Sequence, residues 1–337
     1  MKEALCYEKL DEGKVHCFLC AQHCHIKPGK RGKCGVRENR EGQLWSLVYG
    51  KLIAQHIDPI EKKPLYHFYP GTRSYSIATV GCNFRCSFCQ NADISQAPRE
   101  YKTIYGNDVP AETVVEEAEQ NGCATISYTY TEPTIFMEYA LDVAKRAHDV
   151  GIGNVFVSNG FMTEQSLAVI VPFLDAANVD LKAFTNTFYA DQCGARLEPV
   201  LKTIEGMKKA GVWLEVTTLL IPGLNTDPDE LRRLAGFLVD LDPGIPWHIS
   251  RFYPTYKLTD RPSTPVSTLH MARDIGREAG LHYVYTGNVP GDNGENTYCH
   301  QCGNLLLERF GFSLRRRGIQ AGKCTHCDTE VGGVGIA

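Results

Sequence analysis

The feature that most constrains this chain is a group of three cysteines within eight residues, Cys82, Cys86 and Cys89. The group follows residues 74–80, a β-branched and aromatic stretch that predicts a strand leading into a loop. Structural zinc sites take four protein ligands, and iron–sulfur clusters normally take four cysteines. An isolated C-x3-C-x2-C motif therefore leaves one coordination position of its metal centre without a protein ligand, where a substrate can bind. The alternative is a zinc knuckle that borrows a distant fourth ligand.

Eight further cysteines form two sets with the short spacings of metal ligands, which favour metal sites over disulfides in a chain without an export signal. The N-terminal set fits either a structural zinc or a closed, four-cysteine iron–sulfur cluster, with nearby histidines as alternative zinc ligands. The C-terminal set has two C-x2-C pairs separated by 21 residues, which predicts a zinc ribbon. The two sets are Cys17, Cys20, Cys24 and Cys34, and Cys299, Cys302, Cys324 and Cys327.

The overall charge limits the kinds of partner. The formal net charge is -4, so no global basic field favours nucleic acid or an anionic membrane as the main partner. No run approaches the ~18 apolar residues that a membrane span needs, and the charged N-terminus is unlike a signal sequence. We therefore expect a cytoplasmic protein whose main partner is a small molecule or another protein.

After the central cysteines, predicted helices and strands alternate strictly. Such alternation requires parallel strands joined by right-handed crossovers, either in a doubly wound sheet or in a barrel. The pattern gives six βα units and a further strand. The predicted strands are 74–80, 124–130, 154–160, 178–182, 212–221, 247–253 and 282–285, and the helices are 111–120, 134–150, 163–174, 197–210, 227–241 and 267–279.

Polar residues stand at the carboxyl ends of most of these strands, which favours the barrel. Catalytic groups gathered from many strand ends are typical of a barrel's C-terminal rim. The sequence thus predicts an α/β fold, a partial (β/α)6 TIM-like barrel over residues 73–290. A Cys-rich extension and connector (1–72) precede it, and a zinc-ribbon-like metal-binding segment (291–337) follows. The strand-end residues are Cys82, Glu132, Asn159, Asp180 with Lys182, and His248 with Arg251.

The central motif, with an aromatic residue before its last cysteine and its place after the first strand of a βα barrel, resembles that of the radical S-adenosylmethionine (SAM) superfamily. The wider pattern is similar to the radical SAM enzymes of the AmmeMemoRadiSam system, which are related to pyruvate-formate-lyase-activating enzymes. This likeness covers nearly the whole chain. It rests on both terminal cysteine sets and on residues 81–91, 128–133, 158–160, 180–182 and 287–289.

The resemblance implies a radical SAM barrel that binds a 4Fe–4S cluster through Cys82, Cys86 and Cys89, with SAM on the fourth iron. One-electron reduction would then cleave SAM to methionine and a 5′-deoxyadenosyl radical that abstracts hydrogen from a substrate. A one-electron reductant such as ferredoxin or flavodoxin is implied, and other proteins of the AmmeMemoRadiSam system are candidate partners.

The resemblance also implies the SAM contacts. Glu132 would meet the SAM ammonium, although the two glycines that precede this carboxylate in the family are absent here. Lys182, beside Asp180, would neutralise the SAM carboxylate by a charge-assisted hydrogen bond. The remaining contacts are Ser158 and Asn159 near the ribose and ammonium, and His248 at the ribose or adenine.

Two other readings of the chain stay open. One is a glycyl-radical enzyme activase, which uses the same chemistry on a protein substrate. The other is a non-catalytic zinc and iron–sulfur electron-transfer protein, although a carrier would favour a fully ligated cluster. Cys193, which precedes Gly194 after the fourth strand, is a candidate catalytic thiol near the substrate.

Overall fold

The computed structural model describes residues 1–316 and 318–336. Its centre is an eight-stranded sheet in the order β16-β15-β14-β13-β12-β11-β9-β8. The seven strands from β9 to β16 run parallel, and β8 pairs antiparallel with β9. The predicted parallel α/β sheet is therefore confirmed, with β8 and β16 as its two edges. The strands are β8 (Ala54–Pro59), β9 (Arg73–Ala78), β11 (Thr125–Tyr128), β12 (Gly153–Ser158), β13 (Ala176–Asp180), β14 (Trp213–Leu220), β15 (Trp247–Arg251) and β16 (Val284–Gly287).

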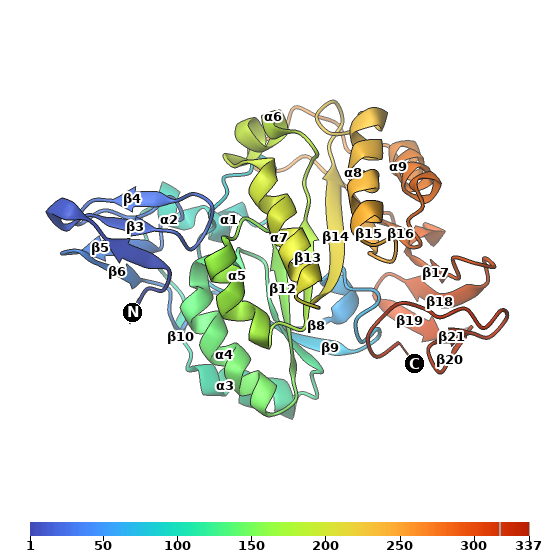
Figure 1. The fold of residues 1–337 in the computed structure, drawn as a ribbon, viewed down its shortest axis with the longest axis horizontal. Helices are drawn as coiled ribbons and strands as arrows, with labels where there is room; N and C mark the ends of the chain where they lie inside the picture. Colours follow the sequence, from blue (N-terminus) through green and yellow to red (C-terminus); the bar gives the residue numbers. More distant parts are fainter. Residues whose placement is uncertain (317, 337) are drawn as a thin grey trace.

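Helices connect the parallel strands and lie along one face of the sheet (Figure 1). Each presents an apolar stripe to the strands, as α4 does with the fully buried side chains of Val143, Ala144 and Ala147. Thr163 caps α5, because its side chain accepts a hydrogen bond from the backbone N–H of Ser166. The long helices are α3 (Ala111–Gln120), α4 (Met137–Asp149), α5 (Glu164–Ile170), α7 (Leu197–Lys209), α8 (Pro228–Leu241) and α9 (Val266–Ala279).

Small sheets extend the molecule at both ends of the chain (Figure 1). The N-terminal ones are joined to the main domain by a buried ion pair, in which Arg37 Nη1 lies 3.0 Å from Glu138 Oε1 on α4. The N-terminal strands are β1 (Lys2–Glu3), β6 (Gln43–Ser46) and β5 (Arg37–Arg40), and β2 (Tyr7–Lys9), β3 (Val15–Cys17) and β4 (Cys24–Ile26). The C-terminal strands are β17 (Thr297–Tyr298), β18 (Leu305–Phe310), β19 (Ser313–Arg316), β20 (Ile319–Gln320) and β21 (Lys323–Cys324).

The segment before β9 differs from the expected connector, because β8 within it is a strand of the main sheet. Residues 60–70 then cross the amino ends of the parallel strands. There Glu215 of β14, fully buried, accepts hydrogen bonds from the backbone N–H groups of Tyr66 (3.0 Å) and His67 (2.8 Å). The C-terminal tail lies beside this segment, since Phe68 and Val334 form an isolated parallel bridge. We call residues 60–70 and 331–336 together the sheet floor.

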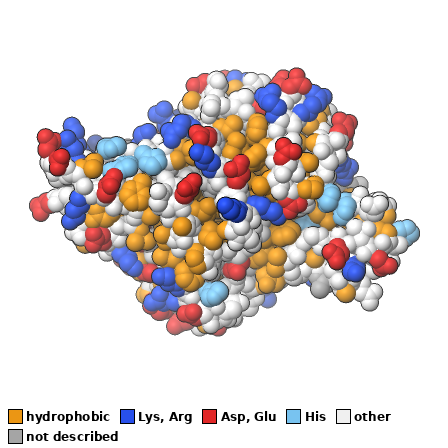
Figure 2. Space-filling model, viewed as in Figure 1, with side chains coloured by type: hydrophobic (Ala, Val, Ile, Leu, Met, Phe, Trp, Pro, Cys, Tyr) orange, Lys and Arg blue, Asp and Glu red, His pale blue; other side chains and the backbone are white. Residues whose placement is uncertain are grey.

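Figure 2, seen from the same side, shows acidic and basic side chains interspersed over the helical face of the molecule. This distribution agrees with the small net charge of the whole chain. Within the part of the chain that the structure describes, no helix combines the length and the apolar character needed to cross a bilayer.

Candidate functional site

The loop after β9 carries the three central cysteines and is held by hydrogen bonds to its backbone. Its N–H groups at Arg85 and Ser87 donate to the carbonyl oxygens of Cys193 and Gln192, each at 2.9 Å. Its carbonyl oxygens at Cys82 and Phe84 accept from the Arg99 guanidinium, each at 2.6 Å. A loop without regular secondary structure is thereby fixed in one conformation, because its polar backbone groups have partners outside it.

Gly81 lets the N-terminal extension approach this loop closely. Its φ is +104°, and an added Cβ would lie 2.6 Å from Val36 Cγ1 and 3.3 Å from the Cys34 carbonyl oxygen. Glycine alone adopts this backbone conformation readily and has no side chain that would clash with Val36.

We expect Gly81→Ala to lower the iron content of reconstituted protein and to destabilise the fold by about 2 kcal/mol, because Val36 must be displaced and the backbone strained. Iron analysis and chemical denaturation would measure both effects. Gly122→Ala is the control, since Gly122 also has positive φ but has nothing within 4 Å of the added Cβ. Equal iron content in the two variants would contradict the prediction.

Glu132, Ser158 and Asn159 are brought together at the ends of β11 and β12. Glu132 Oε1 accepts from the Ser158 hydroxyl at 2.8 Å, and Oε2 accepts from the Asn159 backbone N–H at 2.8 Å. The Asn159 side-chain amide donates to Asn83 Oδ1 at 2.7 Å and lies 3.8 Å from the sulfur of Cys82. Burial raises the pKa of Glu132 although its hydrogen bonds oppose the rise. The Glu132 carboxylate thus holds Asn159, which contacts the cysteine loop, in position.

Asp180 and Lys182 form a second charged pair, at the end of β13, with Nζ and Oδ2 3.0 Å apart. Burial alone would lower the pKa of Lys182, but the charge of Asp180, with that of nearby Cys86, raises it well above its usual value. The ammonium also lies 5.8 Å from the centre of the Phe88 ring, between the second and third cysteines of the loop. A cation is therefore held beside the three thiols.

The spacing of the three thiols fits a cluster better than a single ion. Among the described residues, the C-terminal cysteine set is compact enough for a single ion, with its ligand atoms all within 4.8 Å of one another, and the central cysteines do not form such a group. In a 4Fe–4S cluster each thiolate binds a different iron, so the sulfurs stand farther apart than around one ion. The residues present thus suit the cluster.

His248 and Cys193 lie at different places relative to the predicted SAM contacts. His248 Nε2 is 2.6 Å from Glu215 Oε2, and its ring stacks on Tyr285, so its partners lie toward the sheet floor. Cys193 is fully buried beside the cysteine loop, where a hydrogen bond with its thiol raises the pKa of Cys86, and it also lies near Lys182. Its proposed role near a substrate stays a prediction.

The C-terminal cysteines are compact. Cys299 and Cys327 have their sulfurs 3.6 Å apart, as do Cys302 and Cys324. Four sulfurs at 2.3 Å from a tetrahedral zinc would be separated by about 3.8 Å. This group could therefore hold a metal ion, as the two C-x2-C pairs predict.

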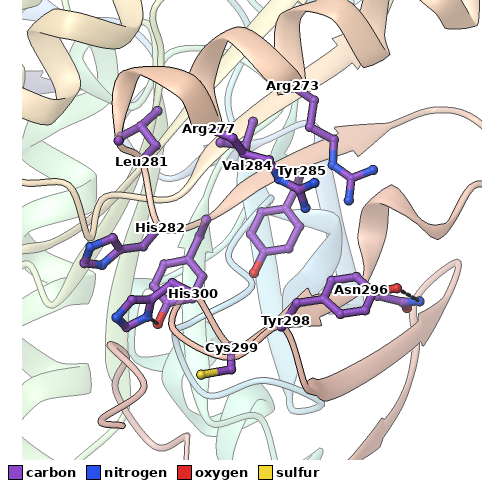
Figure 3. A pocket seen from close by; sticks show the side chains of 13 residues that line it. Arg273, Arg277, Leu281, His282, Val284, Tyr285, Asn296, Tyr298, Cys299 and His300 are labelled. Atoms are coloured by element: carbon purple, nitrogen blue, oxygen red, sulfur yellow. Dashed lines mark hydrogen bonds between the residues drawn. The ribbon is translucent and has the colours of Figure 1, made fainter.

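A cavity of about 580 Å³ lies beside this segment (Figure 3). It is lined from α9 by Arg273 and Arg277 and from the C-terminal segment by Tyr298, Cys299 and His300. None of the cysteines of the loop after β9 lines it. This cavity is therefore separate from the candidate site.

Sequence reasoning missed several residues that hold the site or the sheet floor. Arg99 donates to a backbone carbonyl oxygen of the cysteine loop, and Asn83 accepts a hydrogen bond from the Asn159 side chain; neither contact produces a recognisable sequence motif. Glu215 lies within an otherwise apolar strand. The one available signal for Glu215 was its charge in the otherwise uncharged stretch 212–221.

Comparisons with known proteins agree with this geometry. Residues 76–237 match the family model of the radical SAM superfamily. The chain is 47% identical over 334 residues to the uncharacterized protein MJ0808 of Methanocaldococcus jannaschii, covering 98% of this chain and 99% of that protein. It is 26% identical over 188 residues to 7-carboxy-7-deazaguanine synthase of Thermococcus kodakarensis, covering 51% of this chain and 73% of that enzyme.

Among solved structures, a radical SAM methyltransferase from Sphaerobacter thermophilus superposes with a TM-score of 0.51. The two are 17% identical, and the match covers 71% of each chain, so this likeness shows the fold alone. The full-length relative, the matched family model and the cysteine loop after the first parallel strand lead to one conclusion: the chain is an enzyme of the radical SAM superfamily.

Proposed function

We propose that this enzyme binds a 4Fe–4S cluster through Cys82, Cys86 and Cys89, cleaves SAM there reductively, and abstracts hydrogen from a substrate. The observation that carries the proposal is the convergence of two polar groups on the cysteine loop. Asn159, ordered by Glu132, reaches the first cysteine, and the Lys182 ammonium lies near the second. When bound at the reduced cluster, SAM supplies a 5′-deoxyadenosyl radical and methionine.

The residues around the loop would bind and orient the amino-acid part of SAM. Lys182 suits the carboxylate, because a charge-assisted hydrogen bond to a carboxylate is strong in a buried site. Glu132 Oε1 already accepts three hydrogen bonds, whereas Oε2 accepts one and keeps capacity for an ammonium. Ser158 acts by orienting Glu132, since its hydroxyl donates to that carboxylate.

The inner face of the sheet has polar atoms that suit a polar ligand. Ser76 Oγ, Asn178 Oδ1 and Thr217 Oγ1 are buried without a hydrogen-bond partner. Thr217 pairs with Asp180 across β13 and β14, and Asn178 lies two residues before Asp180 on the same face. Buried polar atoms normally have partners, so these atoms support a polar substrate, or the polar part of SAM, inside the barrel.

Anaerobic turnover tests the proposal. After reconstitution with iron and sulfide, the protein with SAM and a strong one-electron reductant should produce 5′-deoxyadenosine and methionine in equal amounts. Liquid chromatography with mass spectrometry would quantify both. If the cluster is intact and SAM is bound but no 5′-deoxyadenosine forms, the catalytic proposal fails and the electron-transfer alternative is favoured.

The substrate is either a small molecule or a protein, as in a glycyl-radical enzyme activase. The motifs shared with the radical SAM enzymes of the AmmeMemoRadiSam system support a substrate or partner from that system. Ferredoxin or flavodoxin would supply the electron. Deuterium transfer from labelled candidate substrates into 5′-deoxyadenosine would identify the hydrogen donor.

We further propose zinc as the C-terminal metal, because the sulfur separations of 3.6 Å match a tetrahedral Zn–S4 site. Cys302→Ala is expected to lower the zinc content by about one atom per chain, since one thiolate of four is lost. Elemental analysis of the purified protein measures this. Cys123→Ala, at a cysteine outside all three sets, should leave the zinc content unchanged; iron in place of zinc would refute the assignment.

A further inference from the structure

The N-terminal cysteine set, Cys17, Cys20, Cys24 and Cys34, is folded into one small site. Cys17 and Cys24 are direct partners across the β3–β4 pair. The backbone N–H of Lys33, next to Cys34, donates to the Cys24 sulfur at 3.4 Å. Cys20 lies on the connection between β3 and β4, and Cys17, Cys20 and Cys34 are all buried. The four cysteines therefore lie together in one small part of the N-terminal extension.

This site is wider than the C-terminal one. The ligand atoms of the C-terminal set all lie within 4.8 Å of one another, whereas the N-terminal cysteines, which are all described, do not form such a compact group. The central cysteines, which belong to the cluster motif of the family, share this wider spacing. Sulfurs that surround one zinc ion would stand about 3.8 Å apart. The N-terminal spacing thus resembles that of a cluster site.

The nearby histidines do not complete a zinc site. His16 lies between Val15 and Cys17 on β3, so its side chain is on the opposite face of the strand from the Cys17 thiol. Its Nδ1 is 2.8 Å from Glu8 Oε1, and its ring stacks on those of His23 and His25. The three imidazoles therefore form a group of their own.

Arg37 supplies a buried positive charge beside the thiols. Its side chain is 2% exposed, its charge acts on Cys17 and Cys34, and its Nε has no hydrogen-bond partner. A buried, unpaired donor is costly unless an acceptor is bound nearby. Hydrogen bonds to cluster sulfurs are one of the ways in which proteins adjust cluster potentials. The Arg37 charge is paired with Glu138, 3.0 Å away, and its remaining Nε–H group could donate to a bound acceptor such as a cluster sulfur.

The N-terminal cysteine site is in contact with the loop of the central cysteines. The Gln22 side-chain amide donates to the carbonyl oxygens of Asn83 and Gly194, each at 3.1 Å. The Cys34 carbonyl oxygen packs against Gly81, next to Cys82. Because Gly81 directly precedes Cys82, the backbones of Cys34 and Cys82 lie close together.

We propose that Cys17, Cys20, Cys24 and Cys34 bind a second, fully ligated 4Fe–4S cluster, and that this cluster passes electrons to the central one. One electron from a ferredoxin- or flavodoxin-type donor enters at the N-terminal cluster and moves to the cluster at Cys82, Cys86 and Cys89. The donor is oxidised by one electron, the central cluster is reduced by one, and no atom is transferred. The relay rests on the proposed function, whereas the metal assignment does not.

Iron analysis of a variant without the central ligands tests the assignment. Cys82→Ala/Cys86→Ala/Cys89→Ala, reconstituted anaerobically, should keep about four iron atoms per chain and an electron paramagnetic resonance (EPR) signal that SAM does not change, because all four irons have protein ligands. Adding Cys20→Ala/Cys34→Ala should remove this iron. Absence of iron in the triple variant, or a second zinc in its place, would overturn the assignment.

Rapid-mixing reduction tests the relay. Cys20→Ala/Cys34→Ala should lose fast reduction of the central cluster by reduced flavodoxin but keep wild-type reduction by titanium citrate, a small reductant that reaches the central cluster directly. The milder Cys34→Ser is measured alongside, with SAM binding and C-terminal metal as checks of folding. Unchanged reduction by flavodoxin in a variant without N-terminal iron would overturn the relay. Retained iron in the triple variant without 5′-deoxyadenosine in the wild type would overturn the proposed function alone.

Discussion

Cys86→Ala is expected to lose the central cluster and to reduce 5′-deoxyadenosine formation to the background level. Cys86 is the middle ligand of the motif, is buried, and lies next to the Lys182 ammonium. Its removal leaves two protein thiolates for a cluster that takes three in this arrangement, so neither the cluster nor its SAM-binding iron is retained.

Quantifying iron, the EPR signal of the reduced cluster and 5′-deoxyadenosine in the same preparation checks this prediction. Cys123→Ala is the matched control, because Cys123 is a buried cysteine at the entrance to β11, outside the three metal sets. That variant should keep both the cluster and the product. Turnover by Cys86→Ala at more than the background level would refute the ligand assignment.

Glu132→Ala is expected both to destabilise the protein and to abolish SAM cleavage. The carboxylate accepts hydrogen bonds from Thr134, through its N–H and hydroxyl, and from Ser158 and Asn159. Alanine leaves these buried donors without an acceptor, which should lower the free energy of unfolding by about 3 kcal/mol. Asn159 then loses the contact that orders it beside Cys82.

Glu132→Gln separates the two effects. Its amide keeps the shape and one acceptor oxygen, so part of the stability should return, but it lacks the negative charge that would bind the SAM ammonium. Denaturant titration gives the stability, and equilibrium dialysis gives the affinity for SAM. If Glu132→Gln bound SAM as tightly as the wild type, the carboxylate would have only a structural role.

The alternation of parallel strands with helices and the position of the cysteine loop were predictable, because they follow from local patterns, whereas the edge strand β8 was not. Apolar periodicity predicts a helix from a few consecutive residues, and capping residues such as Thr163 and Gly280 predict where a helix begins and ends. The contacts that build the site join residues far apart in the sequence, so local patterns do not predict them. Gln22 bonds a carbonyl oxygen 61 positions away, and backbone carbonyls carry no residue-type signal.

His248 was placed wrongly among the strand-end residues. The predicted strand 247–253 and β15 begin at the same residue, Trp247, so His248 is the second residue of both and lies near the amino end of the strand. The partner that holds it there, Glu215, comes from the neighbouring strand β14.

The sheet floor couples the folding of the C-terminal four-cysteine segment to the folding of the main sheet. The four-cysteine segment ends at Cys327, and a few residues later the tail binds His67, with the Val334 N–H donating to its carbonyl oxygen at 2.8 Å and the His67 ring 2.6 Å from the Gly332 carbonyl oxygen. A metal that binds only the folded segment stabilises whatever is folded with it. We therefore expect that chelating a metal bound at the C-terminal cysteines lowers the melting temperature of the main sheet as well as that of the segment. The reason is that the segment and the sheet fold together.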